Sequence, residues 1–259
     1  MISKRLHLVL LSAFLFFSYT KSAKVWAQGT AVPDHEGWTA LLEKHISDNG
    51  LVDYQGFVSD KTMLNAYAQL LSDNPPAPNW TRNEQIAYWI NAYNVFTVKL
   101  IVENYPLESI KDLNPILAIP TVRSIWSKEW FQIGEELFSL DRIEHKILRR
   151  EFDEPRIHFA INCASISCPV LRAEAYEPAI LYSQLDEQAR LFLNDTTRNL
   201  IDPKKPKVSK IFSWFTDDFT NGQTVVEFIN QYSDIQIAPK TRLRFLEYDW
   251  ALNDTKGVN

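Results

Sequence analysis

The stretch of sequence that decides the fold is IAYWINAYNVFTVKLIV, residues 86–102. It is apolar on nearly every side of a helix, and this pattern indicates a helix buried in the core of a domain. Thr81 and Glu84 have the spacing of a capping box, and Pro106 cannot continue a helix. The sequence therefore predicts one long buried helix over 82–104, around which the remaining elements pack.

The segments on either side of this helix predict shorter elements. Amphipathic spacing predicts helices at 34–47, 61–71, 181–194 and 224–232, with shorter helical segments at about 141–152 and 213–219. Alternating or extended patterns predict strands at 156–162, 207–212 and 241–248, and a hairpin over 130–140 that turns at Gly134. Because the helices come first and the strands come late and are short, we predict an α+β fold. In this fold the buried central helix packs on a small antiparallel sheet within a single domain.

The beginning of the chain has the pattern of an export signal. Lys4 and Arg5 precede an almost wholly apolar run at 8–17, and Val25–Ala27 resembles a small-residue cleavage site. The apolar run is short for a membrane span, which needs about 20 residues. We therefore predict a signal peptide over 1–27 and export to the periplasm or the cell exterior.

The remainder, 28–259, is predicted to be a single globular domain with its core at about 35–253. Cleavage after Ala23 is an alternative. Four of the 27 Lys and Arg residues lie in 1–27, so 23 basic residues face 32 acidic ones and the net charge is −9. This acidic balance argues against nucleic acid as a partner. We expect a small molecule or a peptide as the partner, and no transmembrane span in the mature chain.

The most reactive side chains are concentrated in HFAINCASISCPVL, residues 158–171, which contains both cysteines of the protein. If 156–162 is a strand, His158 and Asn162 share one face, and Cys163 belongs to the opposite, apolar face. His158 is then either a binding or catalytic group or a structural histidine.

The two cysteines permit two interpretations. In an exported protein, a Cys163–Cys168 disulfide is the default expectation. Alternatively, Pro169 opens a helical turn, and Cys168 at its N-terminus is a free nucleophile. His158, or alternatively His145, is then the base, and Asn91 or Asn162 orients the base or binds the oxyanion.

Other polar residues extend this candidate site. Asn91 and Asn94 lie three residues apart on the buried helix, so they project from neighbouring points of one face. They bind a ligand or tie loops to the core. Glu144 and His145 are adjacent, and neighbours in an α-helix diverge by about 100°, so they do not easily face one point.

Neither a metal nor a cofactor is expected. The spacing of the histidines and cysteines matches no standard zinc pattern. No phosphate loop, dinucleotide fingerprint, HExxH or GxSxG motif is present.

Several segments, taken in order and spacing, resemble the domain-of-unknown-function 547 family over roughly 35–253. They are VDY (52–54), YWINAYNVFTVKLI (88–101), IEHKILR (143–149), HFAINCASISCPVL (158–171), IFSWF (211–215) with Asp218-Phe219, and YDWALN (248–253). The resemblance implies no assigned activity. It implies a signature made of Asn91, Asn94, Glu144, His145, His158, Asn162, Cys163, Ser167 and Cys168.

Two functional hypotheses follow. The first is a non-catalytic binding module in which the Cys163–Cys168 bridge shapes a polar pocket. The binding residues of this pocket are Asn94, Glu144, His145, Asn162 and Ser167. The alternative is a thiol-dependent hydrolase or acyl transferase with Cys168 as nucleophile, His158 as base and Asn91 as the orienting group.

Overall fold

The computed structural model describes residues 31–115 and 124–256. The predicted signal peptide, 1–27, lies outside these residues. The long buried helix is confirmed to the residue, because α4 spans Arg82–Asn104. The Thr81 side chain accepts the backbone N–H of Glu84, and the Glu84 carboxylate accepts the backbone N–H of Thr81. From Ile86 to Val102 every residue of α4 except Lys99 is buried.

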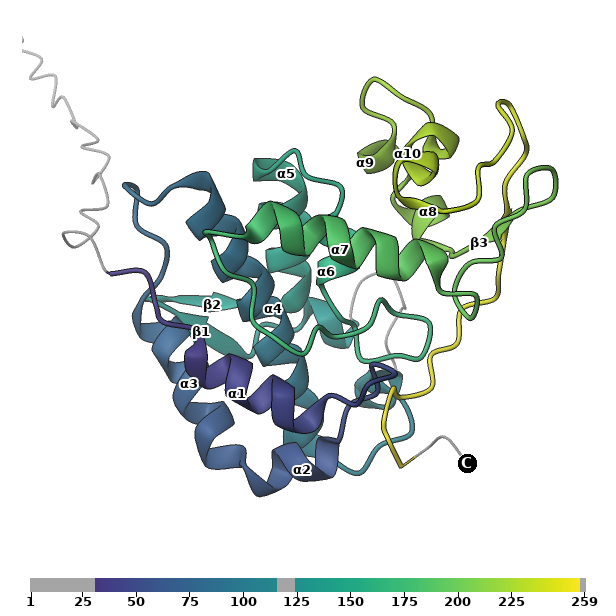
Figure 1. The fold of residues 1–259 in the computed structure, drawn as a ribbon. Helices are drawn as coiled ribbons and strands as arrows, with labels where there is room; N and C mark the ends of the chain where they lie inside the picture. The colour runs from purple at the N-terminus through teal and green to yellow at the C-terminus, as the bar shows by residue number, and fades with distance from the viewer. Residues whose placement is uncertain (1–30, 116–123, 257–259) are drawn as a thin grey trace, which may run out of the picture.

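The N-terminal helices and a hairpin pack around one part of α4 (Figure 1). The helices are α1 (Glu36–His45), α2 (Tyr54–Ser59) and α3 (Lys61–Asp73). The predicted hairpin is β1 (Phe131–Ile133) and β2 (Glu136–Phe138), which pair antiparallel and turn at Gly134 with φ 59°. Phe96 of α4 stacks on Phe131 at 3.9 Å between ring centroids. The α+β fold, with the buried helix packed on a small antiparallel sheet, is confirmed.

The later part of the chain builds a second apolar cluster around Phe159. Its helices are α7 (Leu181–Asn194), α8 (Ile211–Trp214), α9 (Thr216–Phe219) and α10 (Val225–Tyr232). Buried phenylalanines from these helices surround Phe159, namely Phe192, Phe212, Phe219 and Phe228. This packing fixes α8 and α9 beside the segment that contains the cysteines.

The late strands are shorter than predicted. β3 (Lys207–Val208) and β4 (Arg244–Phe245) form a two-residue parallel pair, and the predicted continuation of β3 is the helix α8. The chain then returns to the N-terminal half, where Asp254 bridges Val52. This return places the C-terminal segment, 248–254, beside the cysteine-containing loop.

The predicted strand at 156–162 is wrong. Residues Ile157–Ala160 form a short helix, α6, and only Ile161 and the residues after it are extended. All four residues of α6 are buried, so the segment has no exposed face whose spacing in the sequence would distinguish a helix from a strand. A short run of this kind cannot be assigned to a helix or a strand from periodicity.

The helix predicted at 141–152 differs in type. Residues Arg142–Leu148 form a π-helix, η3, which continues into the short helix α5 (Arg149–Glu151). The remaining elements are short 3₁₀ turns, η1 (Ile110–Leu113) and η2 (Ile125–Ser127). Within 31–115 and 124–256, none of the helices is long and apolar enough to cross a membrane.

Candidate active site

A cavity of about 180 Å³ opens where α4, η3, α8 and the C-terminal segment meet the cysteine-containing loop. Its aromatic lining residues are Tyr93, Trp126, Trp214, Phe215, Tyr248 and Trp250. Its polar lining residues are Ser124, Asp141, Glu144, His145, His158, Cys163 and Cys168. Five of the predicted site residues therefore meet in one place.

The two cysteines are free thiols, so the predicted Cys163–Cys168 disulfide is not present in the structure. Cys168 Sγ instead accepts the backbone N–H of Cys163 at 2.8 Å. A tight turn brings the two residues together: Ala164 has φ 60°, and the Cys168 N–H donates to the Ser165 carbonyl at 3.0 Å. The loop thus holds two neighbouring reduced sulfurs.

The surroundings of the two sulfurs distinguish them chemically. A hydrogen bond from Cys168, together with contacts to the hydroxyls of Ser165 and Tyr248, lowers the pKa of Cys163 to about 7. These contacts outweigh burial, which acts in the opposite direction. Burial raises the pKa of Cys168 well above its ordinary value, and negative charge at Cys163 raises it further.

Cys163 is therefore the thiol with the lowered pKa, whereas the sequence favoured Cys168 as the nucleophile. Cys163 is partly exposed and Cys168 is buried. The helical turn expected after Pro169 is not formed, so Cys168 has no helix N-terminus to lower its pKa. The Pro169 carbonyl instead accepts the Asn162 side-chain N–H at 2.7 Å, and this bond holds the segment extended.

Glu144 supplies a carboxyl group to the same cavity. Burial, and then the negative charge at Cys163, raise the pKa of Glu144 to about 8. The Tyr93 hydroxyl donates to its Oε2 at 3.3 Å. At neutral pH this side chain consequently retains its proton.

Glu144 and His145 both face the cavity, and the expectation that they diverge is wrong. His145 Nδ1 lies 4.0 Å from Glu144 Oε1. The reason is the π-helix η3, whose i→i+5 turns hold more residues than α-helical turns, so that adjacent side chains diverge less. Single π-helical turns occur frequently at functional sites.

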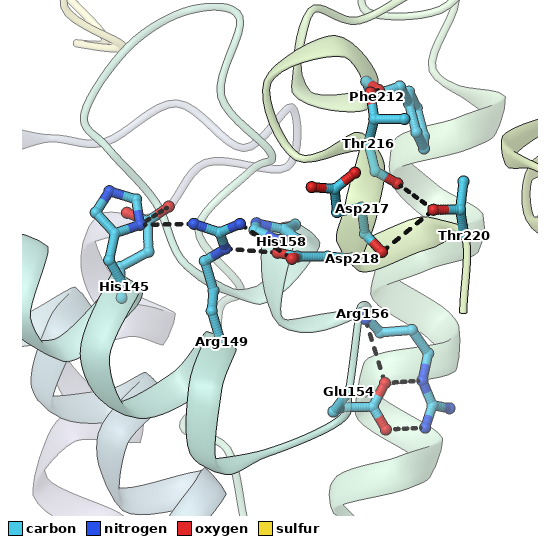
Figure 2. Close-up of polar contacts among 11 residues, drawn as sticks. His145, Arg149, Glu154, Arg156, His158, Phe212, Thr216, Asp217, Asp218 and Thr220 are labelled. Atoms are coloured by element: carbon cyan, nitrogen blue, oxygen red, sulfur yellow. Dashed lines mark hydrogen bonds and ion pairs between the residues drawn. The ribbon is translucent and has the colours of Figure 1, made fainter.

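An ionic network connects the two histidines, as Figure 2 shows. Arg149 lies between them and donates from Nε and Nη2 to Asp218 Oδ2 at 2.5 Å and Oδ1 at 3.0 Å. Asp218 Oδ2 also lies 2.6 Å from His158 Nε2. The Arg149 Nη1 donates to His145 Nδ1 at 3.2 Å.

This network assigns the tautomer of each histidine. Arginine has no acceptor, so His145 Nδ1 must accept and the proton of His145 is on Nε2. Although burial acts to raise it, hydrogen bonds from His158 and Arg149 hold the pKa of Asp218 well below its ordinary value. The ionised Asp218 therefore accepts the Nε2–H of His158.

Both histidines are neutral near pH 7. Burial, followed by the charge on Arg149, lowers the pKa of His145 to about 4. Burial also lowers the pKa of His158, against the opposing effect of Asp218. His158 Nδ1 makes no hydrogen bond with any residue in the described ranges, so a basic nitrogen remains at the cavity wall.

The asparagines of α4 lie behind the cavity rather than in it. Asn91 donates to the Tyr176 carbonyl at 2.8 Å and accepts the Tyr176 N–H at 3.0 Å. Asn94 donates to the Ala160 carbonyl at 3.0 Å and accepts the Asn162 N–H at 2.9 Å. Asn91 thus ties a loop to the core, and Asn94 positions the start of the cysteine-containing loop.

Asn162 and Ser167 also stabilise this loop from within. The Asn162 Oδ1 accepts the Ala164 N–H at 2.9 Å, which fixes the tight turn. The Ser167 hydroxyl accepts the Asp249 N–H at 2.8 Å, which joins the loop to the C-terminal segment. Neither side chain lines the cavity.

Asp218 and Tyr248 contribute to the site but were not proposed from the sequence as functional groups. Asp218 lies 60 residues along the chain from its partner His158, and Tyr248 lies 85 residues from its partner Cys163. Their only signal was their place in the segments that carried the family resemblance. Within the described ranges, no group of three or more His, Cys, Asp or Glu side chains is arranged to hold a metal ion.

A family model described as a protein of unknown function, DUF547, matches residues 77–193. Residues 77–193 of this chain are similar to that family. No curated protein and no solved structure matches the chain. The matched segment holds both cysteines, Glu144 and both cavity histidines, whereas Asp218 and Tyr248 lie beyond it.

Proposed function

We propose that this protein is a thiol-dependent hydrolase or acyl transferase whose nucleophile is Cys163. One observation carries the proposal. A partly exposed thiol with a pKa of about 7 shares a cavity with a carboxyl group, Glu144, that is protonated at neutral pH. An ordinary cysteine, with a pKa of about 8.5, is only a few per cent thiolate at pH 7. The shift in pKa therefore supplies a nucleophile, and Glu144 supplies the matching acid.

The chemistry proceeds in two steps. The Cys163 thiolate attacks the carbonyl carbon of an ester, thioester or amide, and Glu144 gives its proton to the leaving group as the bond to that group breaks. The product of this step is a thioester on Cys163. Water or an acceptor alcohol or amine then attacks the thioester, Glu144 takes the proton back, and the thiolate is released.

The histidines have supporting roles in this scheme. His145 retains an Nε2–H because Arg149 occupies its Nδ1, and this N–H is a donor for the developing oxyanion. His158, which the sequence indicated as the base, has its Nε2 bound to Asp218 and makes no hydrogen bond to either sulfur in the described ranges. Glu144 is the better supported acid and base because its pKa responds to charge at Cys163.

Alkylation of the native protein tests the choice of nucleophile. Iodoacetamide at pH 7.5, followed by peptide mass spectrometry, should modify Cys163 at least about tenfold faster than Cys168. Cys163→Ser should abolish the fast modification and any turnover of ester or thioester substrates, whereas the matched variant Cys168→Ser should retain a fast reaction. Faster modification of Cys168, or equal rates, contradicts the proposal.

A non-catalytic role is the remaining alternative, and the aromatic lining of the cavity favours it. The two roles differ in turnover. If Cys163 is modified rapidly but a panel of esters, thioesters and amides reacts no faster with the wild type than with Cys163→Ser, the cavity is a binding site. The ligand is then the small molecule or peptide expected from the sequence.

We also propose that the protein is exported. The support is the basic start, the apolar run at 8–17 and the small-residue pattern that ends at Ala27. N-terminal sequencing of protein from the periplasm or medium should begin at Lys24 or Gln28. Recovery of the full chain from Met1 in the cytosol would show that no export signal is processed.

A further inference from the structure

The reactive thiol lies at the end of an aromatic wall. Tyr248 and Trp250 come from the C-terminal segment, and Trp214 comes from α8. Their ring centroids are 4.6 Å apart for Tyr248 and Trp250, and 4.8 Å apart for Trp214 and Tyr248. The Tyr248 hydroxyl is 3.3 Å from Cys163 Sγ. A group that packs on these rings therefore lies beside the nucleophile.

The described lining of the cavity contains no cationic side chain, although Lys111 Nζ lies 3.8 Å from the centroid of the Trp250 ring. Neither lysine nor arginine is among its described lining residues. His145 and His158 are neutral because burial lowers the pKa of each. The carboxyl groups among the described lining residues are Asp141 and Glu144. Burial raises the pKa of both, and the Cys163 thiolate adds a negative charge, so the described lining disfavours a carboxylate or a phosphate.

The size of the cavity limits what fits. Its volume is about 180 Å³. An apolar protein cavity of roughly 150 Å³ holds one benzene molecule, and complete drug-sized ligands occupy roughly 300 Å³ or more. The enclosed space therefore matches one six-membered ring, and the rest of a larger ligand would extend through the opening of the cavity.

We propose that this cavity binds a single uncharged aromatic ring of the substrate, against Trp214, Tyr248 and Trp250. The substrate class is then esters, thioesters or amides of short aromatic acyl groups, with the carbonyl directed at Cys163 Sγ. The orientation of the carbonyl toward Cys163 rests on the proposed function, in which Cys163 is the nucleophile. Binding of the ring does not depend on that function. Aromatic side chains that stack on a ring contribute beyond simple burial of area.

Binding is measured first without catalysis, on the full-length Cys163→Ser variant, by ligand-observed NMR. Benzamide is the probe, and benzoate, acetamide and methyl glucoside are compared with it. Benzamide should bind at least about tenfold tighter than the other three. In the same background, Trp214→Ala should weaken benzamide binding roughly two- to tenfold. The control is Phe245→Ala, because Phe245 is an exposed aromatic residue on β4 outside the cavity lining, and it should change nothing.

Turnover by the wild type is the second measurement, with benzoyl and acetyl thioesters of the same thiol. The benzoyl substrate should have the higher kcat/KM, and Trp214→Ala should remove most of the difference. Tight binding of benzoate would contradict the proposal that the ligand is uncharged. Tight binding of methyl glucoside would contradict the proposal that the ligand is an aromatic ring and would indicate a sugar site instead. No benzamide binding together with turnover of both thioesters would refute the ring site and leave the thiol chemistry intact. Benzamide binding without any Cys163 reactivity would refute the proposed function and leave the ring site intact.

Discussion

Cys163 and Cys168 belong to one short loop, and their chemistry differs because their contacts differ. Cys163 is partly exposed and surrounded by groups that stabilise a thiolate, whereas Cys168 is buried and loses its proton only at high pH. Glu144 shows the reverse shift for a carboxyl group, since burial and the charge at Cys163 favour its protonated form. Reactivity at this site is thus determined residue by residue, through burial and hydrogen bonding.

The pH dependence of turnover should be bell-shaped. Activity should rise as the pH increases through about 7, where Cys163 becomes a thiolate, and fall through about 8, where Glu144 loses its proton. Glu144→Gln should lower kcat by about 10²- to 10⁴-fold. The same variant should retain rapid alkylation of Cys163, and this separates loss of the acid from loss of the fold. An unchanged kcat in Glu144→Gln would exclude Glu144 as the acid.

The redox state of the loop is a second prediction at this scale. Protein purified without reductant and unfolded in guanidinium should react with two equivalents of Ellman's reagent, because Cys163 and Cys168 are free. In the native state, the reaction at neutral pH should be rapid for one thiol only. A count of zero before reduction would establish the disulfide that export favours.

At the scale of elements, the site depends on three short helices that meet through one ionic network. Arg149 begins α5, His158 lies in α6 and Asp218 lies in α9. Their hydrogen bonds join the π-helix region to the second apolar cluster, so the orientation of the cavity histidines depends on α9. The stacking of Phe215 on His158, 4.1 Å between centroids, reinforces this placement.

Asp218→Asn should therefore destabilise the fold. The substitution leaves Arg149 without its ionised partner, and the expected loss is about 1–3 kcal/mol because the pair is partly exposed. The stabilisation provided by Asp218 is fully present above its unfolded pKa of about 3.9, and it is lost as the pH falls through its lower folded pKa. Thermal unfolding at pH 7 measures the effect.

Asp217→Asn, at the exposed neighbouring position, is the control. Equal losses of stability in both variants would argue against a specific role of the network.

At the scale of the whole molecule, the cavity is assembled by segments far apart in the chain. The loop at 158–171 provides the thiols, and the C-terminal segment returns to provide Tyr248 and Trp250. The Ile166 N–H donates to the Ala251 carbonyl at 2.9 Å, which holds the two segments side by side. The site is complete only when both apolar clusters have formed.

Tyr248→Phe tests this long-range contact. Removal of the hydroxyl deletes one hydrogen bond to the thiolate, so the pKa of Cys163 should rise by up to about one pH unit. The midpoint of the pH–alkylation curve measures the shift. Tyr182→Phe, at an exposed tyrosine outside the cavity lining, should leave the midpoint unchanged. A midpoint that does not move in Tyr248→Phe would show that the hydroxyl does not stabilise the thiolate.

The elements that the sequence predicted well are those whose pattern is local. α4 and α7 have the predicted bounds. Helical spacing marks both segments, and a capping box also marks the start of α4. The β1–β2 hairpin followed from alternation around Gly134. α6 was predicted as a strand, and η3 was predicted as a helix but not as a π-helix, since a short buried run and a π-turn leave no distinctive period.

The sequence by itself determined the buried central helix, the α+β class, the family resemblance and five of the side chains that line the cavity. Only the tertiary structure showed that Asn91, Asn94, Asn162 and Ser167 bond to backbone groups outside the cavity lining, that the cysteines are unbridged, and that the pKa of Cys163 is the lowered one. The physical reason is that a pKa depends on burial and on neighbouring groups. The groups that matter here, Tyr248 beside Cys163 and Asp218 beside His158, are distant in sequence and meet only in the folded chain.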